Sequence, residues 1–139
     1  MRDAVRNWAR SWARGWATHD MELIGSLYED TAVFRSQPFR EPQDPGGYAQ
    51  WAFEDEESAE VWFAEPVVDG DRALVEWWAI SHGRDGRDTT LAGGASLWFG
   101  PEGRVRRQLD YWNEAADTAL PPPGGWGPVL AHEGSSSVS

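Results

Sequence analysis

The stretch Arg72-Ala73-Leu74-Val75-Glu76-Trp77-Trp78-Ala79-Ile80-Ser81 decides the fold of this chain. It is rich in β-branched and aromatic residues, and turn signals bound it on both sides: Asp69-Gly70 before it and Gly83-Arg84-Asp85-Gly86 after it. The same pattern extends outward in both directions along the chain. We expect strands at residues 60–68, 72–81, 88–99 and 104–113, joined as a run of antiparallel hairpins. Pro66 implies an edge or a bulge in the first of these strands, and Gly93-Gly94 implies a bend or a bulge in the third.

The N-terminal half carries helical signals instead. Trp8, Trp12 and Trp16 recur every four residues and predict a helix over residues 2–18, with an arginine stripe on its opposite side. Asp20 is a candidate N-cap for a short helix over 21–28, and Asp44-Pro45 opens another over 46–56. A short strand is expected at 31–36. Helices followed by hairpins indicate an α+β fold, with helices packed on one face of a curved sheet.

Two of the expected strands carry an acid followed by two aromatic residues, Glu76-Trp77-Trp78 and Asp110-Tyr111-Trp112. Side chains alternate along a strand, so each acid lies on the same face as the second aromatic residue. We expect both acids on the covered face, among indole rings. Poor hydration there would raise a carboxylate pKa and permit general acid–base chemistry near neutral pH.

Composition narrows the classes of function. The net charge is −11, all basic residues are arginine, and there is no cysteine. This excludes a thiolate site and a lysine Schiff base, and it argues against a nucleic-acid partner. No apolar stretch is long enough for a membrane span or a signal peptide, so we expect a cytoplasmic protein with no membrane partner. We expect one domain over residues 1–113 and a Pro/Gly/Ser-rich tail over 114–139, whose Trp126 could dock on the core.

Several segments in order resemble the SnoaL-like branch of the nuclear transport factor 2-like superfamily. They are Gly15-Trp16-Ala17-Thr18-His19-Asp20, Leu27-Tyr28-Glu29-Asp30, Ala73-Leu74-Val75-Glu76-Trp77-Trp78, Phe99-Gly100-Pro101-Glu102-Gly103-Arg104-Val105 and Asp110-Tyr111-Trp112. The resemblance covers residues 4–113. It implies a cone-shaped, antiparallel or mixed sheet wrapped around the N-terminal helices, a deep pocket at the wide end, and a homodimer formed through the sheet.

The superfamily includes ketosteroid isomerases, scytalone dehydratase, limonene epoxide hydrolase, polyketide cyclases and proteins that are not enzymes, so the fold does not settle the function. The three positions that resemble the catalytic set of ketosteroid isomerases hold Trp12, Ser36 and Ala95, which do not match it. Limonene epoxide hydrolase places an arginine between two acids, for which Arg35 is the candidate. SnoaL-type cyclases use a single acid–base carboxylate, and Asp110 lies in the corresponding strand.

These observations predict a hydrophobic pocket protein acting as a cofactor-free acid–base enzyme of the cyclase, isomerase or dehydratase type on a hydrophobic carbonyl compound. The alternatives are a non-catalytic ligand-binding or dimeric scaffold domain, in which Asp110 pairs with Arg35 or Arg40 and Glu76 forms a buried ion pair, and an epoxide hydrolase. No metal site is expected from three scattered histidines. The ligand expected in an aromatic cavity is flat and hydrophobic, including polycyclic compounds. The candidate catalytic residues are Asp110, Glu76 and Arg35, and the candidate ligand-binding residues are Trp12, Trp16, His19, Ser36, Phe39, Trp51, Trp78 and Trp112.

Overall fold

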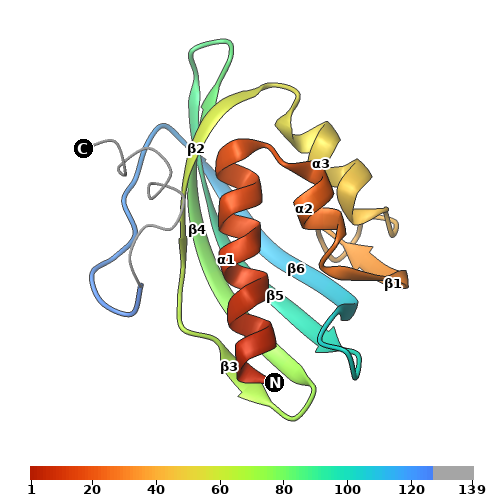
Figure 1. The fold of residues 1–139 in the computed structure, drawn as a ribbon. Helices are drawn as coiled ribbons and strands as arrows, with labels where there is room; N and C mark the ends of the chain where they lie inside the picture. The colour runs from red at the N-terminus through yellow and green to blue at the C-terminus, as the bar shows by residue number, and fades with distance from the viewer. Residues whose placement is uncertain (127–139) are drawn as a thin grey trace.

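A computed structural model describes residues 1–126, in which one curved sheet wraps around three helices (Figure 1). The helices are α1 (Arg2–Thr18), α2 (Met21–Gly25) and α3 (Pro45–Phe53), and all three lie on the concave side of the sheet. The strands are β1 (Tyr28–Arg35), β2 (Glu56–Phe63), β3 (Val67–Asp69), β4 (Arg72–Gly83), β5 (Asp88–Phe99) and β6 (Val105–Ala116). No helix in this part of the chain is long and apolar enough to cross a membrane.

The sheet is mixed and does not close. Its strand order is β1-β6-β5-β4-β2, with β3 also paired to β4, and β1 is parallel to β6 while the other pairs are antiparallel. The predicted α+β fold with a curved sheet around N-terminal helices is therefore confirmed. The single strand expected over 60–68 is instead two strands, β2 and β3, separated around Pro66, which has no N–H to donate to a ladder.

Helix α1 has the boundaries that its tryptophan spacing predicts. Trp8 and Trp12 are buried against the sheet, while the arginines at positions 2, 6, 10 and 14 are exposed. The helix ends where His19 adopts a left-handed conformation with φ of 52°, and the N–H of Asp20 bonds to the carbonyl of Gly15. This tight ending lets the chain reverse directly into α2.

The two predicted N-caps form. The Asp20 carboxylate accepts a hydrogen bond from the N–H of Leu23 at 3.0 Å, and the Asp44 carboxylate accepts one from the N–H of Gly47 at 2.9 Å. Both helices end earlier than expected, at Gly25 and at Phe53. Of the residues beyond these ends, Tyr28 begins β1 and Glu56 begins β2, and the others form turns.

Gly93 lets β6 approach β5 closely, and the pairing at this point contains no bulge. The pairing of β5 with both neighbours continues through Gly93 and Gly94, so the bulge considered at this point is absent. A Cβ at position 93 would lie 1.9 Å from the carbonyl oxygen of Tyr111 and 2.6 Å from the Cα of Trp112. The backbone of β6 therefore approaches β5 here more closely than any side chain would permit.

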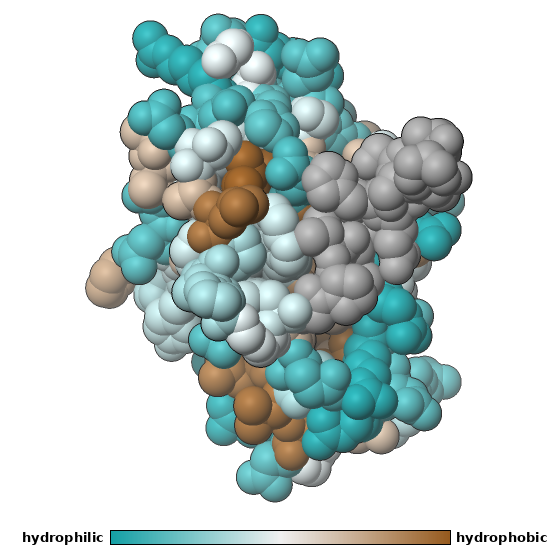
Figure 2. Space-filling model, turned by 90° about the vertical axis from the view of Figure 1, so that its left-hand side faces the viewer, coloured by the Kyte–Doolittle hydropathy of each residue, from teal (hydrophilic) through white to brown (hydrophobic). Residues whose placement is uncertain are grey.

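The chain beyond β6 returns along the convex face of the sheet, which faces the viewer in Figure 2. The indole N–H of Trp78 donates to the carbonyl of Ala119 at 2.8 Å, and Trp126 packs edge-to-face on Trp78 and bridges to Ala64. The docking suggested for Trp126 is thus observed. Hydrophobic residues form two groups on this face in Figure 2, and the rest of the expected tail, residues 127–139, lies outside the described residues.

Candidate active site

A cavity of about 140 Å³ lies between helices α1 and α3 and the concave face of the sheet. Most of its wall is aromatic, and apart from the indole N–H groups its polar groups are two carboxylates, one amide and two hydroxyls. The lining residues are Trp8, Trp12, Trp16, Tyr48, Ala52, Phe53, Glu56, Phe63, Trp77, Ser81, Leu91, Gln108, Asp110 and Trp112. An aromatic space with few polar groups is typical of a small-molecule site.

Asp110 lies on the cavity side of β6, as predicted. Strand alternation places Gln108, Asp110 and Trp112 on one face, and all three line the cavity. The Nε2 of Gln108 donates to Oδ1 of Asp110 at 2.8 Å. Burial raises the pKa of Asp110 from 3.8 to about 7, although the hydrogen bond from Gln108 opposes that rise. This carboxyl therefore titrates near neutrality.

A chain of hydrogen bonds fixes the orientation of Asp110. The indole N–H groups of Trp12 and Trp8 donate to the hydroxyl oxygen of Tyr28, at 2.8 Å and 3.4 Å. The Tyr28 hydroxyl in turn donates to Oε1 of Gln108, which turns the Nε2 of that amide toward Asp110. The pKa of Tyr28 is raised by burial, so its hydroxyl keeps its proton at neutral pH.

The arginines expected near Asp110 point elsewhere. Arg35 donates to the carbonyl of Arg40, and Arg40 donates to the hydroxyl of Ser36 at 2.9 Å. The Arg40 guanidinium also lies over the rings of Trp51 and Trp112. Within residues 1–126, no ion pair involves Asp110, so the interpretation of this residue as a structural acid paired with arginine does not describe the structure.

The expectation that Glu76 shares the covered face with Asp110 is wrong. Glu76 is exposed on the convex face of β4, and the buried aromatic residue of its triplet is Trp77, which lines the cavity. The strand register explains the difference. Val75 pairs with Ala95, which pairs with Asp110, so position 75 and not position 76 lies on the face of Asp110. Trp78 also lies on the convex face, where it contacts residues that follow β6.

Glu56 is a second cavity carboxylate that the sequence did not reveal. It is 5% exposed and accepts hydrogen bonds from the Trp16 indole at 2.9 Å and from the Ser81 hydroxyl. The Nε2 of His19 lies 2.9 Å from its Oε1, and the imidazole stacks on Phe53. Glu56, Ser81 and Ala52 also line an open groove at the β4–β5 hairpin, so the cavity and this groove adjoin at these residues.

The other predicted ligand residues divide into two groups. Trp12, Trp16 and Trp112 line the cavity. Ser36 is buried behind Trp112, whose indole N–H donates to the Ser36 carbonyl at 2.6 Å, while Phe39 and Trp51 are exposed outside the cavity lining. His19 reaches the site only through Glu56.

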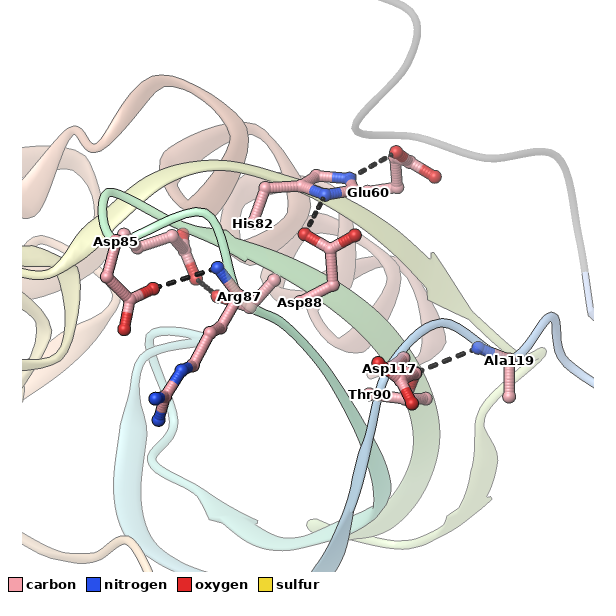
Figure 3. A network of polar contacts seen from close by, with 10 residues as sticks. Glu60, His82, Asp85, Arg87, Asp88, Thr90, Asp117 and Ala119 are labelled. Carbon is pink, nitrogen blue, oxygen red and sulfur yellow. Dashed lines mark hydrogen bonds and ion pairs between the residues drawn. The ribbon is translucent and has the colours of Figure 1, made fainter.

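His82, in β4, belongs to a separate polar cluster on the convex side of the sheet (Figure 3). Its Nδ1 lies 2.8 Å from Asp88 and its Nε2 lies 2.8 Å from Glu60. Hydrogen bonds to these two carboxylates raise the pKa of His82. In the same view, the hydroxyl of Thr90 accepts a hydrogen bond from the N–H of Ala119, which helps to hold the chain that follows β6.

The curved sheet, the helices on its concave side and the aromatic cavity between them define a nuclear transport factor 2-like protein. A family model of the SnoaL-like domain matches residues 9–108, and the chain belongs to this family. No curated protein matches the chain in sequence.

Solved structures support the fold. The Δ5-3-ketosteroid isomerase from Mycobacterium sp. is similar, with a TM-score of 0.67 and 14% identity over 84% of this chain and 100% of that one. The epoxide hydrolase/cyclase-like enzyme SalBIII, associated with pyran ring formation in the polyether salinomycin, is also similar. Its TM-score is 0.69, with 12% identity over 84% of this chain and 99% of that one. A protein from Mycobacterium tuberculosis has a TM-score of 0.71, with 14% identity over 84% of this chain and 98% of that one. At such identities the likeness shows the fold alone.

Proposed function

We propose that this protein is a cofactor-free enzyme that transfers a proton on a hydrophobic carbonyl compound, with Asp110 as the acid–base residue. The observation that carries the proposal is the state of this carboxyl. It lies in an aromatic cavity, no cation neutralises it among the described residues, and burial brings its pKa to about 7. A group with a pKa near the working pH is the most effective general acid–base catalyst.

The chemistry follows from the two forms of Asp110. As a carboxylate it accepts a proton from the carbon next to the carbonyl, and as the neutral acid it returns the proton to another position of the same molecule. Isomerisation, cyclisation and dehydration of carbonyl compounds share this step. The hydrogen bond from Gln108 holds Oδ1 in both forms, which leaves Oδ2 to face the ligand.

Tyr48 is the candidate donor to the carbonyl oxygen. It lines the same cavity, where burial and the charge of Asp110 raise its pKa, although the charge of Arg40 and hydrogen bonds to Arg40 and Ser36 oppose that rise. The hydroxyl therefore keeps its proton. Glu76 and Arg35, the other two predicted catalytic residues, have no part in this proposal because neither lines the cavity. The homodimer also remains a prediction.

The test is deuterium incorporation, which requires no knowledge of the natural substrate. The purified protein is incubated in D₂O with hydrophobic ketones of one to four rings, and loss of the α-proton signals is followed by ¹H NMR. We expect exchange above the buffer rate for at least one ketone, and a decrease of about 100-fold or more in the Asp110→Asn variant. Glu76→Gln is the matched control, because it neutralises an exposed carboxylate on the opposite face.

Equal exchange by wild type and Asp110→Asn would remove Asp110 from the mechanism. Tight binding of a ketone without exchange by the wild type would overturn the enzymatic proposal. That result would instead favour the non-catalytic ligand-binding alternative.

A further inference from the structure

We propose that the cavity selects a neutral ketone or aldehyde carried on a single six-membered ring and excludes fused-ring compounds. The inference deepens the proposed function, on which it rests in taking Asp110 as the group that meets the carbonyl. Three features of the described residues carry it: the size of the cavity, the fixed position of its walls, and the placement of its free polar groups.

Size sets the first limit. The cavity measures about 140 Å³. An engineered apolar cavity of about 150 Å³ in another protein binds benzene, which gives the scale of a one-ring site. A second fused ring therefore needs the walls to move. The polycyclic ligand that the tryptophan content allowed does not fit the cavity as it stands.

The walls resist such movement because four of the lining indoles are tethered through their N–H groups. Trp8 and Trp12 donate to the Tyr28 hydroxyl, Trp16 donates to Glu56, and Trp112 donates to the Ser36 carbonyl. Swinging any of these rings outward would break a hydrogen bond in a buried region, which costs about 1–3 kcal/mol.

The rings also hold one another. Trp12 packs edge-to-face on Trp16, Trp16 on Trp77, and Trp8 on Phe63, with ring centroids 5.7–6.3 Å apart. Each such pair contributes about 0.5–1.5 kcal/mol beyond the burial of its area. These contacts hold the aromatic part of the wall in place, so the space of about 140 Å³ between the rings limits the size of a ligand that binds there.

The tethering also decides which polar groups remain for the ligand. The four tethered indole N–H groups are already engaged, and both polar ends of the Gln108 amide are occupied by Tyr28 and Asp110. At this end of the cavity the Oδ2 of Asp110 remains, beside the hydroxyl of Tyr48, which already interacts with Arg40 and Ser36. Both lie among aromatic rings, so they match a ligand with one polar atom on an otherwise apolar ring.

The experiment is isothermal titration calorimetry at pH 6.0 with three compounds. Acetophenone is the one-ring ketone, α-methylstyrene replaces its carbonyl oxygen with a methylene group of similar shape, and 2-acetylnaphthalene adds a fused ring. We expect acetophenone to bind at least 10-fold more tightly than either of the others.

A pair of variants tests the location. Leu91→Phe adds volume to the cavity wall and should weaken acetophenone binding at least 10-fold. Leu74→Phe makes the same substitution at an exposed position of β4 and should leave binding unchanged. The wild-type ligand series needs no variant, so it tests the size limit even if Leu91→Phe fails to fold.

Three results would overturn the proposal: no measurable binding of acetophenone, equal binding of 2-acetylnaphthalene, or an unchanged affinity in a folded Leu91→Phe protein. The outcome is separate from that of the proposed function. Binding of acetophenone without deuterium exchange of any ketone would refute the proton transfer and keep the size limit. Deuterium exchange on a fused-ring ketone would refute the size limit and keep the proton transfer.

Discussion

Replacing Asp110 with asparagine should stabilise the folded protein at neutral and alkaline pH. Burial raises the pKa of this carboxyl from 3.8 to about 7, so the fold disfavours the charged form. One pKa unit corresponds to about 1.4 kcal/mol, so the penalty for charging Asp110 in the folded protein is at most about 4 kcal/mol. Asparagine removes the charge and still offers Oδ1 to the Gln108 amide, so the variant escapes this penalty and keeps the hydrogen bond.

The sign of the pH dependence follows from proton binding. Between pH 3.8 and about 7 the unfolded chain loses the Asp110 proton while the folded protein keeps it. The folded state then binds more protons, so the stability of the wild type falls as pH rises through this range. The advantage of Asp110→Asn should therefore grow from pH 4 to pH 7 and stay level above. Between pH 5 and pH 9 it should grow by about 2–3 kcal/mol.

Urea denaturation of wild type and variant at pH 5, 7 and 9 measures this difference, and the other titrating groups cancel because both proteins contain them. Glu76→Gln is the control, with an expected difference near zero at every pH because that carboxylate is exposed. A difference between Asp110→Asn and wild type that does not change with pH would show that the pKa of Asp110 is not raised. The acid–base role assigned to it would then lose its physical basis.

Three further predictions concern other parts of the molecule. Gly93→Ala should destabilise the fold by about 3 kcal/mol or more in urea denaturation, because its Cβ would overlap the backbone of β6; Gly94→Ala, where the nearest atom is 3.6 Å away, should cost clearly less. Tyr28→Phe should cost about 1–3 kcal/mol, because it leaves the Gln108 carbonyl and two indole N–H groups without a partner, and an intact stability would contradict the network. The raised pKa of His82 means that its ion pairs stabilise the fold below about pH 6.5 and lose this effect as pH rises through the folded pKa. His82→Gln should therefore be more destabilising at pH 6 than at pH 9, and an equal effect at both would count against the ion pairs.

Local signals predicted the helices well. The spacing of Trp8, Trp12 and Trp16 determines a helix face within one segment, and the Asp20 and Asp44 caps act on N–H groups three residues away. None of these features depends on distant parts of the chain.

Strand alternation predicted the site only in part. It determines which residues share a face, but it does not determine which face is covered. In Glu76-Trp77-Trp78 both faces of the strand carry an indole, so the pattern fits whether Glu76 or Trp77 lies on the covered face. The pairing of β4 with β5 places Trp77 there. In β6 the face of Asp110 also carries Gln108, which is buried, and Trp112.

The remaining site residues depend on contacts that a single sequence does not display. The pairing of β2 shifts register between Glu56 and Ser58, so the alternation read from Val61 and Phe63 does not extend back to Glu56. Tyr28 and Gln108 lie 80 residues apart and meet only because β1 pairs in parallel with β6. Glu56 and the Tyr28–Gln108 pair can therefore be assigned to the site only from the three-dimensional structure.

The position of Asp110 explains why comparison by aligned residues is a poor guide to function in this chain. Ala95 is one of the three positions that resemble the catalytic set of ketosteroid isomerases, and this chain has no acid there. Ala95 and Asp110 are register partners on the adjacent strands β5 and β6, and Asp110 enters the cavity from this neighbouring strand. The pKa of Asp110 is raised because the cavity shields the carboxyl from water, and this effect does not depend on which strand carries the residue. A carboxyl placed one strand away can therefore have a pKa near neutrality, so the absence of an acid at position 95 argues against a shared catalytic set but not against acid–base catalysis.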